Sequence, residues 1–473
     1  MKPLISYGLY LALILVTEGK AIQAQTIQRG NSRSSRHYPN DWYMRDLADD
    51  SIPGISLYKA YQLLAGRKSQ PVIVAVIDNG VDITHEDLKQ VIWTNTVEIP
   101  GNGKDDDHNG YIDDIHGWNF RGAKDGSTVE HEQAEITHIY SLWKTKYDQV
   151  DSSLLRADQK REWRIYQKAK AAYLEAIKGR TDTANLAYTY NLQYNSSLRI
   201  GDDPGNLTQK HYGSPLFNLT PNLTHGTHVA GIIAAQRNNQ IGIRGITDNV
   251  LIMPILATTG RGDERDKDVA NAIRYAVRNG AKVINLSFSK PFSPFKQVVD
   301  VAIQYAETHG VLIFHAAGND GSNNDTANHY PIAQYNNGQK ASNFITVGWT
   351  KPFYDERLVA YYSNYGAHTV DLFAPGSDIV STLPGNQYGE KSGTSMATPV
   401  VSGVAALLWS YFPSLTSAQI KDILLTSTSK PNLEVNQPGS KQKVPFSTLS
   451  ITGGIVNAYS AVKMALALEK AAK

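Results

Sequence analysis

The 473-residue chain contains no cysteine. Disulfides, a cysteine nucleophile, cysteine-based zinc sites and a lipid anchor attached to cysteine are therefore excluded. The net charge is also small, because 46 basic residues nearly balance 44 acidic ones and leave a total of +2. Neither a basic surface for nucleic acid nor an acidic tail is indicated. Beyond the first residues of the chain, no apolar run approaches the length of a membrane span.

The amino terminus has the pattern of a secretory leader. Lys2 provides a positive start, the stretch Leu4–Val16 is largely apolar, and Ala24 is a suitable cleavage site. The apolar stretch is too short to span a bilayer comfortably, so a retained membrane anchor is the weaker alternative. We expect residues 1–25 to be removed and the protein to be exported to the periplasm or the exterior, without a stable membrane anchor.

The remainder of the chain alternates predicted strands with predicted helices. The run Val72–Ile77 is apolar and rich in β-branched residues, which is typical of a buried parallel strand. Further strands are predicted at 250–256, 281–286, 311–316 and 344–347, and helices at 266–278, 295–309, 414–425 and 457–468. This alternation predicts an α/β domain with a mostly parallel central sheet flanked by helices. In the preceding segment, residues 26–70, Ser56 is expected to cap a helix that runs through Leu64.

A serine within the stretch Gly393–Pro399 is the strongest candidate for a nucleophile. The glycine permits a tight turn, and the small apolar residues Val400–Leu408 predict a buried helix. Ser395 would lie at the N-terminus of this helix, where free N–H groups and the helix dipole favour a developing negative charge. Pro399 suits the first turn of a helix. An ordinary N-cap serine is the alternative, and the rest of the chain decides between the two.

A nucleophilic serine needs a base, and the base needs an orienting group. His225 opens a second helix-like run of small residues, in the stretch HGTHVAGIIAA. Asp78 ends the predicted strand 72–77, and the functional groups of open α/β sheets gather at this carboxyl edge. We therefore expect these two residues to meet Ser395 there. His228 is the rival base, although a buried structural role suits it better.

These stretches resemble the motifs of the subtilisin-like serine proteases, the subtilases. The aspartate motif is VIDNGVDITHEDL, the histidine motif HGTHVAGIIAA and the serine motif GTSMATPVVSGVAALL, in the chain order of that family. HAAGND, residues 315–320, is similar to the segment that carries the oxyanion-hole asparagine, here Asn319. VINLSFS, residues 283–289, is similar to the strand that pairs with the substrate main chain. The resemblance covers about residues 72–96 and resumes at about residue 223.

The resemblance implies a secreted serine endopeptidase with a subtilisin-like three-layer fold in residues 71–473. Asp78, His225 and Ser395 would form its catalytic triad and act through an acyl-enzyme intermediate. Protein or peptide is the implied substrate, no cofactor is required for the chemistry, and the sequence indicates no particular oligomeric state. A catalytically silent binding protein on the same fold and an esterase that uses the same site are the alternatives.

The chain departs from the family pattern at two positions. Asn79 replaces the usual serine or threonine, but its amide can still donate a hydrogen bond to Asp78. Ser289 stands where subtilisins often have glycine, and its side chain is expected to narrow the substrate groove. The residues implied to bind substrate are Ser287, Phe288, Ser289, Ala316, Ala317 and Gly318. The small residues among them predict a first pocket that admits a large apolar or aromatic side chain.

An insertion of about residues 97–221 interrupts the resemblance and contains an acidic loop, residues 105–114. Aspartates alternate there and precede a glycine, as in the first half of an EF-hand calcium loop. The twelfth position is His116 and not the usual glutamate, so a later aspartate would supply that carboxylate. The predicted calcium ligands are Asp105, Asp107, Asn109 and Asp113, with Asp114 as the alternative to the last. A solvated acidic turn is the competing interpretation, and the family resemblance alone adds Asp87 as an oxygen ligand.

The insertion also contains a helical region, residues 130–178. Apolar and aromatic residues recur at helical spacing within 136–143 and within 166–177, and the pattern breaks at 148–153. These features predict a helical hairpin or two packed helices. The aromatic stripe is expected to pack against the main domain, and a lid over the substrate cleft is the alternative.

Overall fold

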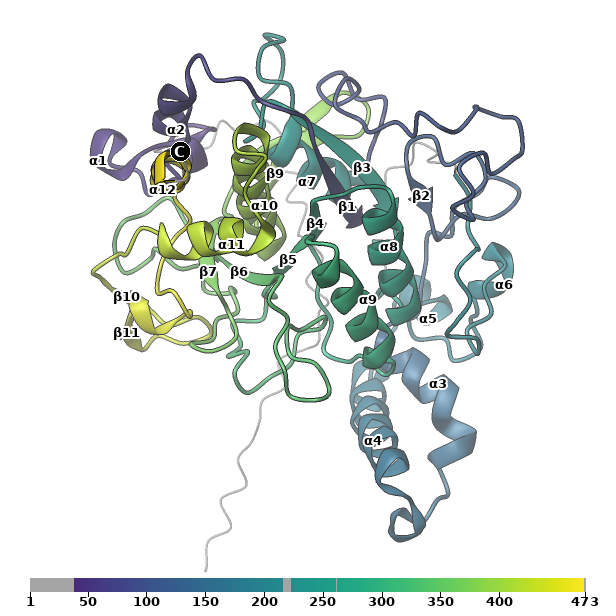
Figure 1. Ribbon diagram of the computed structural model, residues 1–473. Coiled ribbons are helices and arrows are strands. Elements are labelled where there is room, and N and C mark those ends of the chain that lie inside the picture. Colours follow the sequence, from purple (N-terminus) through teal and green to yellow (C-terminus); the bar gives the residue numbers. More distant parts are fainter. Residues whose placement is uncertain (1–37, 216–222, 261, 472–473) are drawn as a thin grey trace, which may run out of the picture.

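A central sheet with helices on both faces forms the body of the protein (Figure 1). The computed structural model describes residues 38–215, 223–260 and 262–471. The predicted leader lies outside these ranges. Among the helices that they contain, none combines the length and the hydrophobicity needed to cross a membrane.

Seven parallel strands make up the sheet, in the order β2-β3-β1-β4-β5-β6-β7. They are β1 (Val72–Asp78), β2 (Trp118–Asn119), β3 (Val250–Leu256), β4 (Val283–Leu286), β5 (Leu312–Ala316), β6 (Phe344–Thr350) and β7 (Leu372–Pro375). β1 lies between β3 and β4, with Ile77 opposite Ile255 and Leu286. Because a parallel sheet is covered on both faces, its strands are continuous apolar runs. The predicted α/β architecture is confirmed.

Alternate side chains of β1 enter two separate cores, because neighbouring residues of a strand point to opposite faces. The helices that cover the sheet are α7 (Thr224–Ala234), α8 (Asp266–Arg278), α9 (Lys296–Thr308) and α10 (Thr394–Tyr411). Val74 and Val76 pack with α7 and α10, whereas Ala75 and Ile77 pack with α8 and α9. The two cores make a three-layer arrangement in which α10 is buried along its whole length.

Smaller elements complete the main domain. They are the antiparallel pairs β8 (Ile379–Leu383) with β9 (Gln387–Lys391) and β10 (Glu434–Asn436) with β11 (Lys443–Pro445), and the helices α11 (Ser417–Thr426) and α12 (Ala458–Ala471). The helix α8 and the strand β3 have the bounds that the sequence predicted. Other predicted elements differ by a few residues at their ends, where helices and strands fray.

The amino-terminal segment is part of the main core. It contains the short helices at Trp42–Met44 and α1 (Leu47–Asp50), followed by α2 (Leu57–Leu64). The side chain of Trp42 is fully buried in the core beside α10 and α12, and its indole N–H donates to the carbonyl oxygen of Ser377 at 3.0 Å. The predicted helix through Leu64 is confirmed, with Ser56 at its N-cap position, but the side chain of Ser56 makes no capping hydrogen bond. Its hydroxyl accepts a hydrogen bond from Asn457 Nδ2 at 3.1 Å, which a pattern of neighbouring residues cannot reveal.

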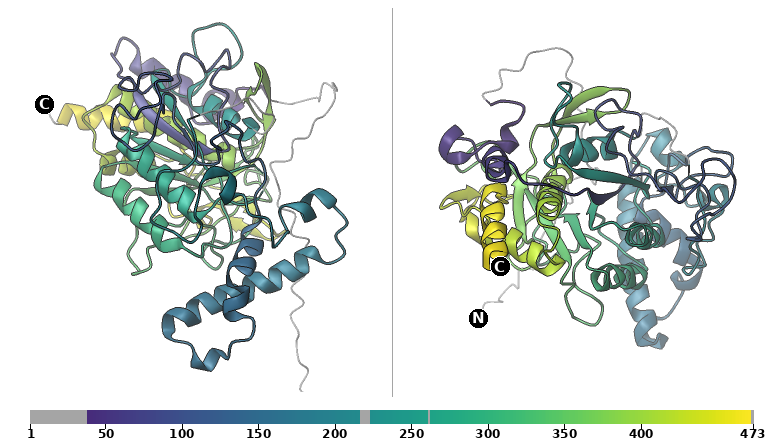
Figure 2. Two further views of the ribbon diagram at one scale, coloured as in Figure 1. Left: turned by 90° about the vertical axis from the view of Figure 1, so that its right-hand side faces the viewer. Right: turned by 45° about the horizontal axis from the view of Figure 1, so that its top comes forward.

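The insertion forms the predicted helical hairpin, which extends away from the body (Figures 1 and 2). Its helices are α3 (Glu135–Tyr147) and α4 (Ala157–Ile177), and the short helices α5 (Thr183–Ala187) and α6 (Ser197–Ile200) follow them. The aromatic stripe packs mainly between α3 and α4, in a small core that includes Tyr140, Trp143 and Tyr166. Phe292 and Phe295 of the main domain pack against this core, so the expected packing on the main domain is limited to the base of the hairpin.

Replacing Trp42 by alanine is expected to destabilise the whole protein by about 3–5 kcal/mol, because a buried indole leaves a cavity and an unpaired carbonyl behind. Denaturant unfolding measures this loss. Leu154, which is 82% exposed, provides the matched control, and its replacement by alanine should change the free energy of unfolding by less than about 0.5 kcal/mol. Equal stability of the Trp42→Ala variant and the wild type would mean that the amino-terminal segment is detachable.

Candidate active site

Asp78 lies at the carboxyl end of β1, where the strand pattern placed it. Its carboxylate is buried and accepts a hydrogen bond from the backbone N–H of Asn79 at 2.8 Å. His225 is the second residue of α7, and its Nδ1 lies 2.8 and 2.9 Å from the two oxygens of Asp78. This contact holds Nδ1 against the carboxylate and leaves Nε2 on the opposite edge of the ring, which is 22% exposed.

Asn79 joins β1 to α7. Besides the backbone hydrogen bond to Asp78, its side-chain Oδ1 accepts from the backbone N–H of Gly226 at 2.9 Å. A Cβ on Gly226 would lie 2.2 Å from the carbonyl oxygen of Gly80, so the close approach of the two segments requires glycine. The asparagine that replaces the usual serine or threonine is therefore compatible with a fixed position for His225.

Ser395 is the second residue of α10 and is hydrogen-bonded to the residue that directly follows β4, the strand next to β1. Its hydroxyl donates to the carbonyl oxygen of Ser287 at 2.8 Å, and the hydroxyl of Ser287 donates to the carbonyl oxygen of Ser395 at 2.9 Å. That carbonyl is available because Pro399, four residues later, has no N–H. The helix begins at Thr394, so Pro399 lies in its second turn, and the prediction of the first turn was wrong.

The three predicted triad residues thus lie at one edge of the sheet. Of the two hydrogen bonds that a triad needs, the one between Asp78 and His225 is formed. Within the described ranges, no hydrogen bond joins the hydroxyl of Ser395 to the ring of His225. The hydroxyl is instead directed to Ser287, which directly follows β4. Catalytic hydrogen bonds are often long or misaligned without substrate and tighten when it binds.

Asn319 follows β5 and is held in a defined orientation by the start of α10. Its Oδ1 accepts from the backbone N–H of Thr394 at 2.9 Å and from the hydroxyl of Thr394 at 3.0 Å. These two bonds identify the oxygen of the amide and leave Nδ2 as a donor. In the part of the chain that the structure describes, no protein group accepts from Nδ2. The residue before Ser395 thus orients the amide that was predicted to hold the oxyanion.

The residues implied to line the first pocket lie in the stretches that end or follow β4 and β5, which are neighbours in the sheet. Ala316 and Ala317 are buried, whereas Phe288 is half-buried. A Cβ on Gly318 would lie 2.3 Å from Nδ2 of Asn364 and 3.0 Å from Nδ1 of His329, so an amide and an imidazole lie beside this residue. Sequence reasoning missed His329 because no motif contains it. It is a polar side chain beside Gly318, one of the residues that were expected to border an apolar pocket.

The sequence model of the subtilase family matches residues 69–446. The chain belongs to the subtilase family. It is 38% identical over 240 residues to a thermophilic serine proteinase from Bacillus sp. (strain AK1), a match that covers 50% of this chain and 52% of that protein. It is also 38% identical over 204 residues to subtilisin NAT from Bacillus subtilis subsp. natto, and this match covers 42% of this chain and 49% of that protein. The chain therefore spans about half the length of these relatives.

A solved structure of proteases from Pseudoalteromonas arctica shares the fold. The match covers 91% of this chain and 100% of that chain, with a TM-score of 0.54 and 22% sequence identity. Together with the seven parallel strands, it confirms the predicted subtilisin-like fold.

His228 has a structural position in this subtilase. Its ring is fully buried, and Nε2 lies 2.9 Å from the carbonyl oxygen of Ile379 and 3.1 Å from that of Gly389. Burial lowers the pKa of His228 to about 3. The side chain therefore ties α7 to the β8–β9 pair, and without access to solvent it is no rival to His225 as a base.

The acidic loop brings three carboxylates together. Oxygens of Glu98, Asp105 and Asp107 all lie within 4.8 Å of one another. Glu98 is buried, and sequence reasoning missed it because it lies outside the EF-hand-like spacing. All three also accept hydrogen bonds from backbone N–H groups of the loop, but like charges at this separation still repel one another unless a cation binds. Since calcium prefers several hard oxygen ligands, the donor set fits that ion.

The other two predicted ligands are engaged in turns of the same region. Oδ1 of Asn109 accepts from the backbone N–H of Tyr111 at 2.7 Å. The carboxylate of Asp113 accepts from the backbone N–H groups of Asn102 and Gly103 at 3.1 and 3.0 Å. In the described residues neither belongs to the group of converging carboxylates.

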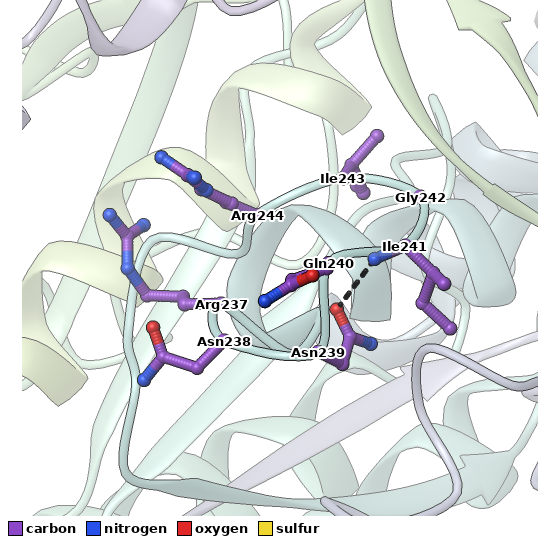
Figure 3. A pocket seen from close by; sticks show the side chains of 8 residues that line it. All are labelled: Arg237, Asn238, Asn239, Gln240, Ile241, Gly242, Ile243 and Arg244. Atoms are coloured by element: carbon purple, nitrogen blue, oxygen red, sulfur yellow. Dashed lines mark hydrogen bonds between the residues drawn. The ribbon is translucent and has the colours of Figure 1, made fainter.

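Asp87 anchors a second loop, which follows α7. The loop Arg237–Arg244 curls around a hollow, and Figure 3 shows Asn239 directed to the backbone N–H of Ile241. Asp87 accepts from Asn239 Nδ2 at 2.6 Å and from the backbone N–H of Ile243 at 3.0 Å. Donors of the loop thus compensate its negative charge. The assignment of Asp87 as an oxygen ligand remains a prediction.

The buried imidazole of His228 is expected to make the protein less stable in acid. With its pKa at about 3 in the folded state and an ordinary value of 6.5, the folded state binds fewer protons than the unfolded state between these limits. The free energy of unfolding therefore falls as the pH falls through this window. The His228→Gln variant, which keeps a donor for the two carbonyls, should lower the slope by up to about 1.4 kcal/mol per pH unit.

Denaturant unfolding between about pH 4 and about pH 7 measures that slope. The exposed His309 supplies the control, and its replacement by glutamine should leave the wild-type slope unchanged. An identical slope in the wild type and the His228→Gln variant would contradict a neutral, buried His228.

Proposed function

We propose that this protein is an exported serine endopeptidase that hydrolyses peptide bonds through an acyl-enzyme intermediate. The observation that carries the proposal is the contact of His225 Nδ1 with the buried carboxylate of Asp78, at the sheet edge that also holds Ser395. A carboxylate in this place fixes the tautomer that presents Nε2 as a base. Membership of the subtilase family supports the same assignment.

In the proposed reaction, substrate binding turns the hydroxyl of Ser395 from the carbonyl of Ser287 to Nε2 of His225. The imidazole takes the proton as the serine oxygen attacks the peptide carbonyl, and then gives that proton to the leaving amine. Asp78 stabilises the imidazolium that forms. Water then attacks the acyl-enzyme with the same base and restores the serine hydroxyl. No cofactor is needed for these steps.

The negative charge that develops on the carbonyl oxygen needs two donors. Nδ2 of Asn319 is free to donate because Oδ1 is held by Thr394. The backbone N–H of Ser395 lies in the first turn of α10, where helix N–H groups have no acceptor within the helix. Both donors are fixed before the reaction, so they stabilise the oxyanion without reorganisation. The proposed substrate strand lies along Ser287–Ser289.

The domain boundaries are part of the proposal. A leader of residues 1–25 directs export, residues 26–70 form the amino-terminal segment, and residues 71–473 form the peptidase domain with its insertion at about 97–221. Trp42 is fully buried beside α10. The exported enzyme is therefore expected to keep its chain from Trp42 onward, because removal of this side chain would open the core.

The Ser395→Ala variant tests the nucleophile. It is expected to lose casein cleavage by about a million-fold in kcat, the size of the effect in subtilisin, with an unchanged melting temperature. Ser410 lies at the far end of the same helix and donates to the carbonyl oxygen of Gln70. Its replacement by alanine is the control and should retain full activity.

A fluorophosphonate probe separates the alternatives. Covalent labelling that disappears in the Ser395→Ala variant supports an activated serine. Labelling with ester turnover but no peptide cleavage would instead assign an esterase. A wild-type protein that is neither labelled nor active would be a catalytically silent member of the family.

We also propose that Glu98, Asp105 and Asp107 hold a structural calcium ion. Their converging carboxylates and their hard oxygen chemistry support this assignment. Asn109 and Asp113 then serve the loop by closing its turns. The ion would take no part in the chemistry and would stabilise the beginning of the insertion.

Calcium is expected to raise the stability of the wild type, by about 2.7 kcal/mol at a concentration one hundred times its dissociation constant. Thermal unfolding in EDTA and in excess calcium measures this difference. The Asp105→Asn, Asp107→Asn double variant should lose the response. Asp125 caps a nearby exposed turn, and the Asp125→Asn control should keep it. The same melting temperature for the wild type with and without calcium would rule the site out.

A further inference from the structure

A cluster of buried charges joins the insertion to the segments beside the proposed substrate strand. Its members are Glu132 and Glu135 of the insertion, Arg121 after β2, Arg265, Asp266 and Asp268 around the start of α8, and Lys290 after β4. The side chains in its ion pairs are at most 13% exposed. None of these residues has a part in the proposed chemistry, so the cluster needs a separate explanation.

Lys290 is the centre of this cluster. Its Nζ donates to the carbonyl oxygen of Glu264 at 2.6 Å and lies 2.9 Å from Asp266 Oδ1 and 3.4 Å from Glu135 Oε1. Its backbone exchanges two hydrogen bonds with Tyr330, at 3.1 and 2.8 Å. Lys290 is also the residue that directly follows the substrate-binding stretch. Three separate segments of the chain therefore determine where that stretch ends.

Glu135 is the contribution of the insertion. It is the first residue of α3, and its Oε2 accepts from Arg265 at 2.8 Å while its Oε1 faces Lys290. Its backbone N–H donates to Asp263 Oδ2 at 2.7 Å. Arg265 also donates to Glu132 at 2.7 Å. The base of the hairpin is thus attached to the segment before α8 and to the segment after β4 by the same carboxylate.

Electrostatic interactions within the cluster restrict the positions of Lys290 and Glu135. Burial lowers the pKa of Lys290, but Asp266 and Glu135 outweigh it, so that the pKa lies above its ordinary value. Burial raises the pKa of Glu135 to about 7, although Lys290 and Arg265 oppose the change. A buried charge that loses its partner is strongly destabilised. Lys290 is therefore held close to Asp266 and Glu135, and the preceding stretch Ser287–Ser289 is held with it.

We propose that Glu135 is a positioning residue for extended substrates, which acts through Lys290 to hold the stretch Ser287–Ser289 in the place where the substrate main chain pairs. The insertion then belongs to the substrate-binding apparatus, although its hairpin extends away from the body (Figure 2). This inference rests on the proposed peptidase function. It gives the insertion a role in the binding of long substrates, and no role in the chemical step.

The test compares two substrates in the wild type and in the Glu135→Gln variant. One is a fluorogenic peptide that extends over several residues before the cleaved bond, and the other is a single-residue ester that reaches only the triad. Loss of the buried carboxylate that faces both Arg265 and Lys290 should lower kcat/KM for the peptide about tenfold, mainly through KM. Turnover of the ester should stay within about twofold, because it does not use the strand.

A matched control lies in the same insertion. Glu162 of α4 pairs with Lys146 and with the hydroxyl of Tyr147 inside the hairpin. The Glu162→Gln variant should leave both substrates unaffected. Equal losses for peptide and ester in Glu135→Gln, or no loss for either, would overturn the inference.

Two further arms keep the outcomes distinct. If Glu135→Gln does not fold, Lys290→Arg takes its place, since it keeps the charge but changes the geometry around Glu135. The same selective loss of kcat/KM for the peptide is then expected. An unchanged ratio of kcat/KM for the peptide to kcat/KM for the ester would contradict the inference. A wild-type protein that cleaves neither substrate would instead refute the proposed peptidase function.

Discussion

The buried carboxylate of Asp78 at the end of the central strand is the constraint on which the site depends. A charge removed from water is costly unless other groups compensate it. The backbone of Asn79 and the ring of His225 supply that compensation, and the second of these joins β1 to the first turn of α7. The close approach of Gly226 to Gly80 allows it. One electrostatic requirement thus places a strand and a helix that are far apart in the chain.

The start of α10 is the second fixed point. Ser287 and Ser395 exchange hydroxyl-to-carbonyl hydrogen bonds, one of which uses the carbonyl that Pro399 leaves without a partner. Thr394 uses its backbone and its hydroxyl to orient Asn319. The proposed nucleophile, the proposed oxyanion donor and the proposed substrate strand are therefore held by one set of contacts. The missing N–H of a proline within a helix is ordinarily destabilising, but here it leaves a carbonyl oxygen that accepts a hydrogen bond from Ser287.

The insertion shows how a segment outside the shared fold can be joined to it. Its hairpin has a small aromatic core of its own, and Phe292 and Phe295 pack against that core from the main domain. The base of the hairpin is attached more firmly, through the buried ion pairs of Glu135 with Arg265 and Lys290. Apolar packing tolerates substitutions that conserve volume, whereas the loss of one partner from a buried ion pair is strongly destabilising.

The sequence by itself determined the features that depend on neighbouring residues. The apolar runs predicted the parallel sheet, the spacing of apolar residues predicted α8 and the hairpin, and the motifs placed Asp78, His225 and Ser395 at the ends of their elements. Small errors arose at helix starts, as at Thr394, because caps depend on contacts as well as on local pattern.

Only the tertiary structure decided which distant groups meet. It brought Glu98 to Asp105 and Asp107, assigned the hydroxyl of Ser56 to Asn457, and placed Lys290 between three segments. The physical reason is that strand and helix patterns come from neighbouring residues, whereas hydrogen bonds and ion pairs require atoms a few ångströms apart, wherever they lie in the chain.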